Sequence, residues 1–108
     1  MSRAMTIQSH DAMTTVIHCK RQKHGPNYVY IGRPSKWGNP FEIGKRGDRE
    51  AVIRKYRDWI TSGEGRHLLT DLHELTGKQL GCWCKPLACH GDVLAELADA
   101  SLLRPGNP

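Results

Sequence analysis

The stretch KQLGCWCKPLACHGDVLAELA, residues 78–98, decides the fold. Its first part, residues 78–84, is mostly apolar and predicts a buried strand. From Asp92 onward apolar residues recur three and four positions apart, which predicts a helix over residues 92–102. The chain therefore passes from a buried strand into a helix through a short loop that contains proline, cysteine and histidine.

The segments before this stretch predict two further strands and two further helices. Residues 14–20 are rich in β-branched side chains and residues 28–31 form a second short apolar run, so both predict strands. A helix is predicted from an N-cap at Asp48 to a stop at Gly63, because its apolar residues are spaced by three and four positions. A shorter, leucine-lined helix follows and ends at Gly77.

The expected order is therefore β-β-α-α-β-α, an α/β fold in one small domain with a short, mainly parallel sheet flanked by helices. A strand passes through a loop into a helix twice, before Asp48 and before Asp92. Ligands of open α/β sheets bind at such turns, beyond the carboxyl ends of the strands. Both unusual loops of the chain lie there, and we expect them to face one pocket.

Length and composition restrict the class of protein. With 108 residues, 38% of them hydrophobic and 25% charged, the chain suits one domain with one core. We expect a mobile leader over residues 1–13, a domain over 14–102 and a frayed tail over 103–108. No apolar run approaches the roughly 20 residues that cross a bilayer, so no membrane partner is expected.

Charge and cysteine content indicate the partner and the compartment. The start of the chain has no signal-peptide pattern, so we expect a cytoplasmic protein, in which cysteines stay reduced. A tight cysteine cluster then favours metal binding or thiol chemistry over disulfides. The formal charge of +5 indicates an anionic partner such as a nucleotide, a nucleoside or a nucleic acid. A basic surface that is merely solvated explains the same charge.

The loop YIGRPSKWGNPF, residues 30–41, carries groups that suit a nucleotide. Arginine and lysine bind phosphate, tryptophan stacks on a base, and glycine and asparagine offer amides to its edges. The alternative is that Trp37 and Phe41 fill the base of the sheet while the cations are solvated. The candidate ligand-binding residues of this loop are Arg33, Ser35, Lys36, Trp37, Gly38 and Asn39.

The cysteine loop allows a metal site. Cys82, Cys84, Cys89 and His90 are four ligands of the type that zinc prefers. Zinc modules usually pair ligands two to four residues apart and take the second pair from a distant element, whereas here all four lie on one segment. No cofactor is therefore favoured, although zinc remains an alternative. On a buried strand, Cys82, Trp83 and Cys84 are also explained as plain core residues.

The same loop also allows thiol chemistry at the start of the last helix. The N-terminus of a helix lowers the pKa of a thiol and attracts anions, so Cys89 is a candidate nucleophile and Gly91 a candidate phosphate contact. His90 is a candidate acid or base, with Asp92 beside it in the first turn. His90 as a backbone-satisfied neighbour of the N-cap, and Asp92 as a helix-stabilising charge, are the structural alternatives.

YIGRPSKWGNPF followed by LGCWCKPLACHGDVLAELA resembles a family of short bacterial and phage proteins, domain of unknown function 4326 (DUF4326), over about residues 14–98. This resemblance implies no activity. The second motif is also similar, more loosely, to a segment before the last helix of another family, DUF488. There an arginine follows the histidine where this chain has Gly91, which implies that backbone and Arg33 or Lys36 hold the anion. The looser resemblance also implies that Cys84 is not an obligate metal ligand.

These observations predict a small α/β enzyme that binds a nucleotide, nucleoside or nucleic-acid base between the two loops, in phage or mobile-element nucleotide metabolism or base modification. Glycosidic-bond cleavage, other group transfer and hydrolysis all fit the residues. The alternative is a non-catalytic, zinc-stapled nucleic-acid-binding module. A third possibility is an interaction protein with reduced, buried cysteines and no ligand.

Overall fold

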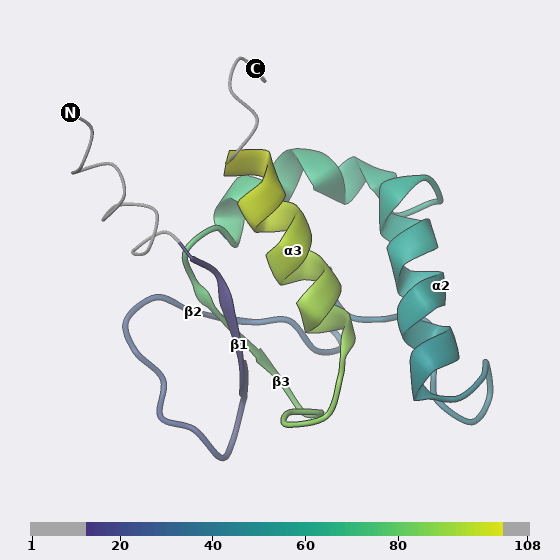
Figure 1. Cartoon of the computed structure of the whole chain (residues 1–108), viewed down its shortest axis with the longest axis horizontal. Helices are drawn as coiled ribbons and strands as arrows, with labels where there is room; N and C mark the ends of the chain where they lie inside the picture. Colours follow the sequence, from purple (N-terminus) through teal and green to yellow (C-terminus); the bar gives the residue numbers. More distant parts are fainter. Residues whose placement is uncertain (1–12, 103–108) are drawn as a thin grey trace.

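A three-stranded parallel sheet packed against helices forms the protein (Figure 1). The structure is a computed structural model and describes residues 13–102, so the expected leader, apart from Met13, and the expected tail lie outside the described residues. The expected order β-β-α-α-β-α is confirmed. The elements are β1 (Thr15–His18), β2 (Tyr28–Tyr30), α2 (Arg49–Thr61), the 3-10 helix η1 (Arg66–Glu74), β3 (Gln79–Cys82) and α3 (His90–Leu102).

The last strand in the chain lies in the middle of the sheet. The strand order is β1-β3-β2, and both pairings are parallel, with Gln79 opposite Thr15 on one side and Tyr28 on the other. Helix α3 packs against β1 and β3, and α2 and η1 pack against α3 (Figure 1). The carboxyl ends of all three strands therefore lie at one edge of the sheet, where the loops after β2 and β3 begin.

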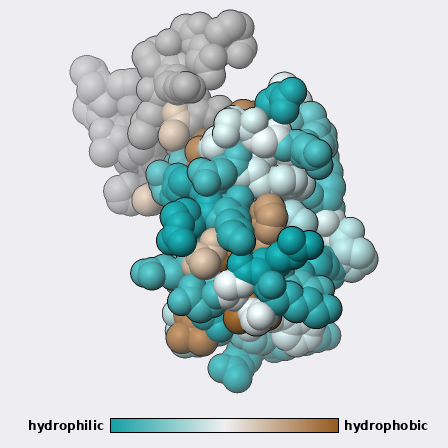
Figure 2. All heavy atoms as spheres, turned by 90° about the vertical axis from the view of Figure 1, so that its right-hand side faces the viewer, coloured by the Kyte–Doolittle hydropathy of each residue, from teal (hydrophilic) through white to brown (hydrophobic). Residues whose placement is uncertain are grey.

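Helix α2 forms as its sequence predicts. Asp48 is the N-cap, and its carboxylate accepts a hydrogen bond of 2.9 Å from the backbone N–H of Ala51. Val52, Tyr56 and Ile60 lie on its buried side. Its outer side contributes to a face that is mostly hydrophilic, with small and separated hydrophobic areas (Figure 2). The predicted second helix is a 3-10 helix that ends at Glu74, and the turn after it contains Gly77, which has a φ of 75°.

The cysteine segment differs in two details from its prediction. Strand β3 ends at Cys82 instead of Cys84, because the chain turns directly after it and the backbone N–H of Leu87 donates to the carbonyl of Cys84 (2.8 Å). Trp83 therefore lies outside the sheet and is 57% exposed, so its interpretation as a core residue is wrong. Helix α3 begins two residues earlier than predicted, at His90.

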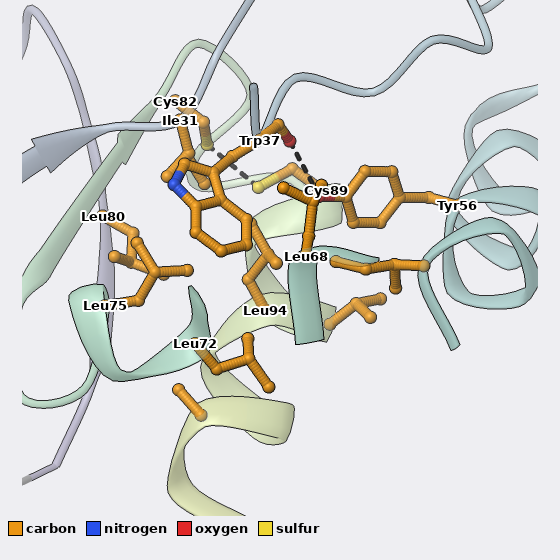
Figure 3. Close-up of a cluster of buried hydrophobic side chains, with 13 residues drawn as sticks. Ile31, Trp37, Tyr56, Leu68, Leu72, Leu75, Leu80, Cys82, Cys89 and Leu94 are labelled. Atoms are coloured by element: carbon orange, nitrogen blue, oxygen red, sulfur yellow. Dashed lines mark hydrogen bonds between the residues drawn. The ribbon is translucent and has the colours of Figure 1, made fainter. Parts of the chain in front are cut away.

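The core lies between the sheet and the helices. Within residues 13–102, none of the helices is long and apolar enough to span a membrane. The hydroxyl of Tyr56 donates to the carbonyl of Trp37 (2.7 Å), which joins α2 to the loop after β2 (Figure 3). The largest buried cluster contains Ile31, Trp37, Tyr56, Ile60, Leu68, Leu72, Leu75, Leu80, Cys82, Cys89, Val93, Leu94 and Ala98.

Candidate functional site

A cavity of about 490 Å³ lies at the carboxyl ends of β2 and β3. It is lined by the loop after β2 (residues 32–43), the segment 82–90 and the first turns of α2. Both loops that the sequence singled out thus border one cavity. Parallel strands place them together, because each strand releases its chain at the same edge of the sheet. This volume lies in the usual range for small-molecule sites.

Two cysteine thiols form part of the cavity wall, at its buried end. The sulfurs of Cys82 and Cys89 are 2.9 Å apart and point at each other beside the indole of Trp37 (Figure 3). Their side chains are 1% and 2% exposed, yet both line the cavity. Cys82 is the last residue of β3, and Cys89 directly precedes α3. The turn between them brings their sulfurs into contact.

The two thiols have different pKa values, with that of Cys82 lowered and that of Cys89 raised. The hydrogen bond from the S–H of Cys89 is the largest cause that lowers the pKa of Cys82, to about 6. The backbone N–H groups of Cys84 and Lys85 and the Lys85 ammonium also lower this pKa, whereas burial raises it. The same hydrogen bond, together with burial, raises the pKa of Cys89. The lowered pKa of Cys82 and the raised pKa of Cys89 both favour the thiolate on Cys82, whereas the sequence indicated Cys89.

His90 also lines the cavity, as a neutral ring. Its Nε2 lies 2.8 Å from the carbonyl oxygen of Ile31, and because a carbonyl only accepts, Nε2 carries the proton. Burial lowers the pKa of His90, and the Ile31 hydrogen bond opposes this only in part. The ring edge packs on Tyr56, with centroids 4.9 Å apart. Nδ1 is therefore the nitrogen that can accept a proton.

An aromatic wall stands at the outer part of the cavity. The indole N–H of Trp83 donates to the hydroxyl of Tyr30 (2.9 Å), which in turn donates to the carbonyl of Arg33 (3.1 Å). This chain of hydrogen bonds joins the cysteine loop to the loop after β2. It holds the exposed Trp83 ring in one orientation, with both Trp83 and Tyr30 lining the cavity. A planar, apolar ring held in this way is suited to stacking on a base.

Two guanidinium groups line the cavity, one from the loop after β2 and one from the start of α2. Arg33 donates to the carbonyl of Asn39 (3.0 Å), and Arg49, the first residue of α2, donates to the carbonyl of Ala88 (3.1 Å). Each guanidinium has five N–H donors in a planar fork, so one such bond leaves donors for an anion. Glu42 also lines the cavity, with a carboxylate oxygen 3.9 Å from Arg33.

The expected roles of Trp37 and Lys36 need correction. Trp37 is 3% exposed and its ring lies within the core, so it cannot stack on a base there. Lys36 lies 2.9 Å from the carboxylates of both Asp71 and Glu74 on η1. These ion pairs raise the pKa of Lys36. Its charge is thus balanced away from the cavity, so it does not supply the expected phosphate contact.

Other residues of the glycine-rich loop shape the turn instead of offering groups to a ligand. The backbone N–H of Gly38 donates to the carbonyl of Ser35 (3.0 Å), and a Cβ at Gly38 would meet the Arg33 backbone at 3.0 Å. Asn39 lines the cavity, but its side-chain amide donates to the carbonyl of Val52 (3.1 Å) and accepts from the backbone N–H of Phe41 (2.9 Å). Ser35 lies outside the cavity lining, and its buried hydroxyl has no partner among the described residues.

Gly91 and Asp92 build the start of α3 and do not line the cavity. A Cβ at Gly91 would lie 2.8 Å from Ile31 and 2.9 Å from Val16, so glycine allows α3 to approach the sheet, and its N–H points to the sulfur of Cys89 (3.3 Å). The Asp92 carboxylate accepts from the backbone N–H of Cys89 (3.1 Å), a capping-box arrangement. The expected phosphate contact and catalytic role at these two positions are thus replaced by structural roles.

The expected zinc set does not assemble in this arrangement. Within residues 13–102 no group of three or more histidine, cysteine, aspartate or glutamate side chains is placed to hold a metal ion. Tetrahedral zinc with bonds of about 2.3 Å would hold two sulfurs roughly 3.8 Å apart. The sulfurs of Cys82 and Cys89 lie closer, at 2.9 Å, and Nε2 of His90 is bonded to backbone. The thiols are arranged to share a proton.

Sequence reasoning missed the cavity residues Tyr30, Glu42, Arg49 and Trp83. Tyr30 begins the motif YIGRPSKWGNPF but looks like an ordinary strand residue, and Arg49 looks like an ordinary first residue of a helix. Trp83 did have a signal, since it alternates with Cys82 and Cys84 and must point the other way. A strand that continues past Trp83 would bury it in the core, and the turn after Cys82 exposes it instead.

The fold and the site define a class of protein, a small α/β domain in which parallel strands direct a glycine-rich loop and a cysteine loop onto one cavity. Within this class, the chain belongs to the family Domain of unknown function (DUF4326), whose family profile matches residues 17–100. The resemblance seen in the two motifs is thereby confirmed.

Two viral proteins are similar to the chain. "Uncharacterized protein R718" of Acanthamoeba polyphaga mimivirus is 39% identical over 87 residues, covering 64% of this chain and 65% of that protein. "Uncharacterized 12.4 kDa protein in nrdA-td intergenic region" of Enterobacteria phage T4 is 40% identical over 74 residues, covering 66% of this chain and 67% of that protein. The chain thus spans about two thirds of the length of each relative. No solved structure matches it.

Proposed function

We propose that the protein is a small enzyme that binds a nucleotide, nucleoside or nucleic-acid base in the cavity and acts on it with the Cys82 thiolate. The observation that carries this proposal is the combination, within one cavity, of a thiol pair at its buried end and an aromatic wall and two guanidinium groups farther out. A side chain in a cleft whose pKa is shifted by a specific partner is a typical candidate for an active-site group.

The chemistry of the lining supports a base joined to a sugar or phosphate. The exposed face of Trp83 suits stacking on a flat heterocycle. Arg33 and Arg49 suit a phosphate, because guanidinium groups bind phosphate in a bidentate manner. The origin of both relatives in viral genomes supports a role in viral nucleotide or base modification.

The thiol pair suits nucleophilic group transfer. A bond forms between the sulfur of Cys82 and an electrophilic atom of the substrate while the bond to the leaving group breaks, and the leaving group takes the proton of Cys89. An acceptor then displaces the sulfur and its proton returns to Cys89. Water as the acceptor gives hydrolysis, including hydrolysis of a glycosidic bond, and another nucleophile gives transfer. His90 lines the same cavity, and its Nδ1 can take this proton from the acceptor and pass it on to Cys89.

Trp83→Ala should weaken nucleotide or nucleoside binding by roughly tenfold to a hundredfold. Loss of base stacking on an aromatic ring costs about 1–3 kcal/mol, and every 1.4 kcal/mol corresponds to about tenfold in affinity. Isothermal titration calorimetry or equilibrium dialysis with a panel of bases, nucleosides and nucleotides measures the change.

Leu87→Ala is the matched control for this variant. Leu87 is on the same loop and is 54% exposed, close to the 57% of Trp83, but it does not line the cavity. Its replacement should leave affinity unchanged. Equal losses in the two variants, or binding of the panel that is indifferent to Trp83, would contradict the proposed site.

A further inference from the structure

Positive charge is concentrated in one part of the chain. Residues 14–41 contain no aspartate or glutamate, and the next acidic residue is Glu42. The cations of this range are Lys20, Arg21, Lys23, Arg33 and Lys36. The first three are exposed and lie in the loop between β1 and β2, and no carboxylate pairs with them within residues 13–102.

This loop, residues 19–27, has a defined conformation. Nδ1 of His18 accepts hydrogen bonds from the backbone N–H groups of Lys20 (3.0 Å) and Arg21 (3.1 Å), which turns the chain at the end of β1. His24 stacks on Tyr28, with centroids 3.6 Å apart, and its Nε2 lies 2.7 Å from the carbonyl oxygen of Cys19. The cations are therefore presented from a folded loop.

Trp83 connects this basic loop to the cavity. The edge of its ring packs on His18, with centroids 5.8 Å apart, and the Lys20 ammonium lies 5.9 Å from the ring centroid. The same ring lines the cavity. A second hollow, of about 350 Å³, is lined in part by His18, Arg21 and Lys85. The Lys85 ammonium is paired with Asp92 (2.8 Å), so Arg21 is the cation of this hollow without a carboxylate partner among the described residues. The turn that follows Trp83 therefore borders both the cavity and this hollow.

The cations of the loop do not line the cavity. Arg33 and Arg49 are sufficient to bind the phosphate of a mononucleotide in the cavity. A mononucleotide would therefore leave Lys20, Arg21 and Lys23 without a ligand. An oligonucleotide would contact both the cavity arginines and the loop cations, because its neighbouring phosphates extend beyond the base that is bound in the cavity. Single-stranded nucleic acid is bound in this way, by a basic track beside aromatic rings on which bases stack. A base can enter a cavity only when it is out of the helical stack.

We propose that the substrate is single-stranded nucleic acid, whose backbone crosses the basic loop 19–24 while one base passes Trp83 into the cavity. This inference rests on the proposed function and specifies its substrate class. Lys20, Arg21 and Lys23 contact phosphates, and Trp83 stacks on the base at the entrance. The hollow beside Lys85 takes the adjacent part of the backbone.

The test measures binding of labelled DNA and RNA single strands of about 12 nucleotides by fluorescence anisotropy, between about 50 and 200 mM salt. The variant Lys20→Ala/Arg21→Ala/Lys23→Ala should lose at least about tenfold in affinity. Its slope of log affinity against log salt should fall by about 2, because single strands contribute roughly 0.7 per phosphate contact. Its affinity for mononucleotides should stay unchanged.

The control variant is Arg46→Ala/Arg54→Ala/Lys55→Ala, which removes the same charge from exposed positions outside the cavity lining. It should lose less than about threefold, because long-range attraction alone is screened at these salt concentrations. Equal losses in the two triple variants would overturn the inference and leave the proposed function intact. Mononucleotides that bind as tightly as the oligonucleotides, or duplexes that bind as tightly as single strands, would overturn it as well.

The same experiment distinguishes failure of the proposed function from failure of this inference about the substrate. Oligonucleotide binding that needs the loop, is indifferent to Trp83→Ala and leaves Cys82 open to alkylation would overturn the proposed function and, with it, entry of a base into the cavity. Binding that needs both the loop and Trp83, and that protects Cys82, supports both proposals. Comparison of the DNA and RNA strands decides which of the two is the substrate.

Discussion

Trp37→Ala is expected to lower the free energy of unfolding by about 3–5 kcal/mol, the range for removal of a large buried aromatic side chain. The ring is 3% exposed and lies in the main core cluster. Because a domain of this size has about 5–15 kcal/mol of stability in total, the variant should be much less stable or fail to fold. Urea unfolding followed by far-ultraviolet circular dichroism measures the loss.

Trp83→Ala is the matched comparison for Trp37→Ala. The Trp83 ring is 57% exposed and makes one exposed hydrogen bond, so its removal should lower stability by no more than about 1.5 kcal/mol. Trp37 thus lies in the core, as one of its two sequence interpretations expects, whereas Trp83, interpreted as a core residue, lines the cavity. A Trp37→Ala protein of nearly normal stability that no longer binds nucleotides would show that Trp37 is a ligand residue after all.

Cys89→Ala is expected to move the pH midpoint of Cys82 alkylation from about 6 up to about 8.5, the ordinary value of a thiol. A lowered pKa means that the reactive thiolate forms as the pH rises through about 6. Removal of the Cys89 S–H donor takes away the largest cause of that lowering. At pH 6.5 the alkylation rate should fall about tenfold, because the greater nucleophilicity of a more basic thiolate offsets part of the loss of thiolate.

Rates of iodoacetamide labelling between pH 5 and 9, with each modified cysteine identified by mass spectrometry, give this midpoint. Cys84→Ala is the matched control, because it removes another thiol of the cavity while its backbone N–H still serves Cys82. Its midpoint should stay near 6. An unchanged midpoint in Cys89→Ala would show that the two thiols do not share a proton.

The sequence predicted the fold well where local signals decide it. Asp48 followed by a helical apolar pattern specifies α2, and the buried run of β3 specifies the central strand. The site was predicted only in part. That both loops meet follows from parallel strands, but the exposure of Trp83 depends on where β3 ends, and this is set by the turn after Cys82. The contact between the sulfurs of Cys82 and Cys89 likewise depends on that turn.

Residues without a motif could not be identified from the sequence. Arg49 belongs to the cavity only because the start of α2 lies beside Ala88. Lys36 has the chemistry of a phosphate ligand, yet η1 brings two carboxylates to it. In each case the deciding partner lies more than 30 positions away in the sequence, as the separations of 39 and 35 residues in these contacts show.

Protection of Cys82 by a bound ligand tests the central claim most directly. The rate of Cys82 alkylation at pH 7 is measured alone and with a saturating panel of bases, nucleosides, nucleotides and single-stranded oligonucleotides. The account predicts rapid labelling of Cys82 that at least one of these classes slows tenfold or more, in proportion to its occupancy and with Cys19 unaffected. Rapid labelling that no compound of the panel slows, or a Cys82 thiol that is unreactive at pH 7 even without ligand, would contradict it.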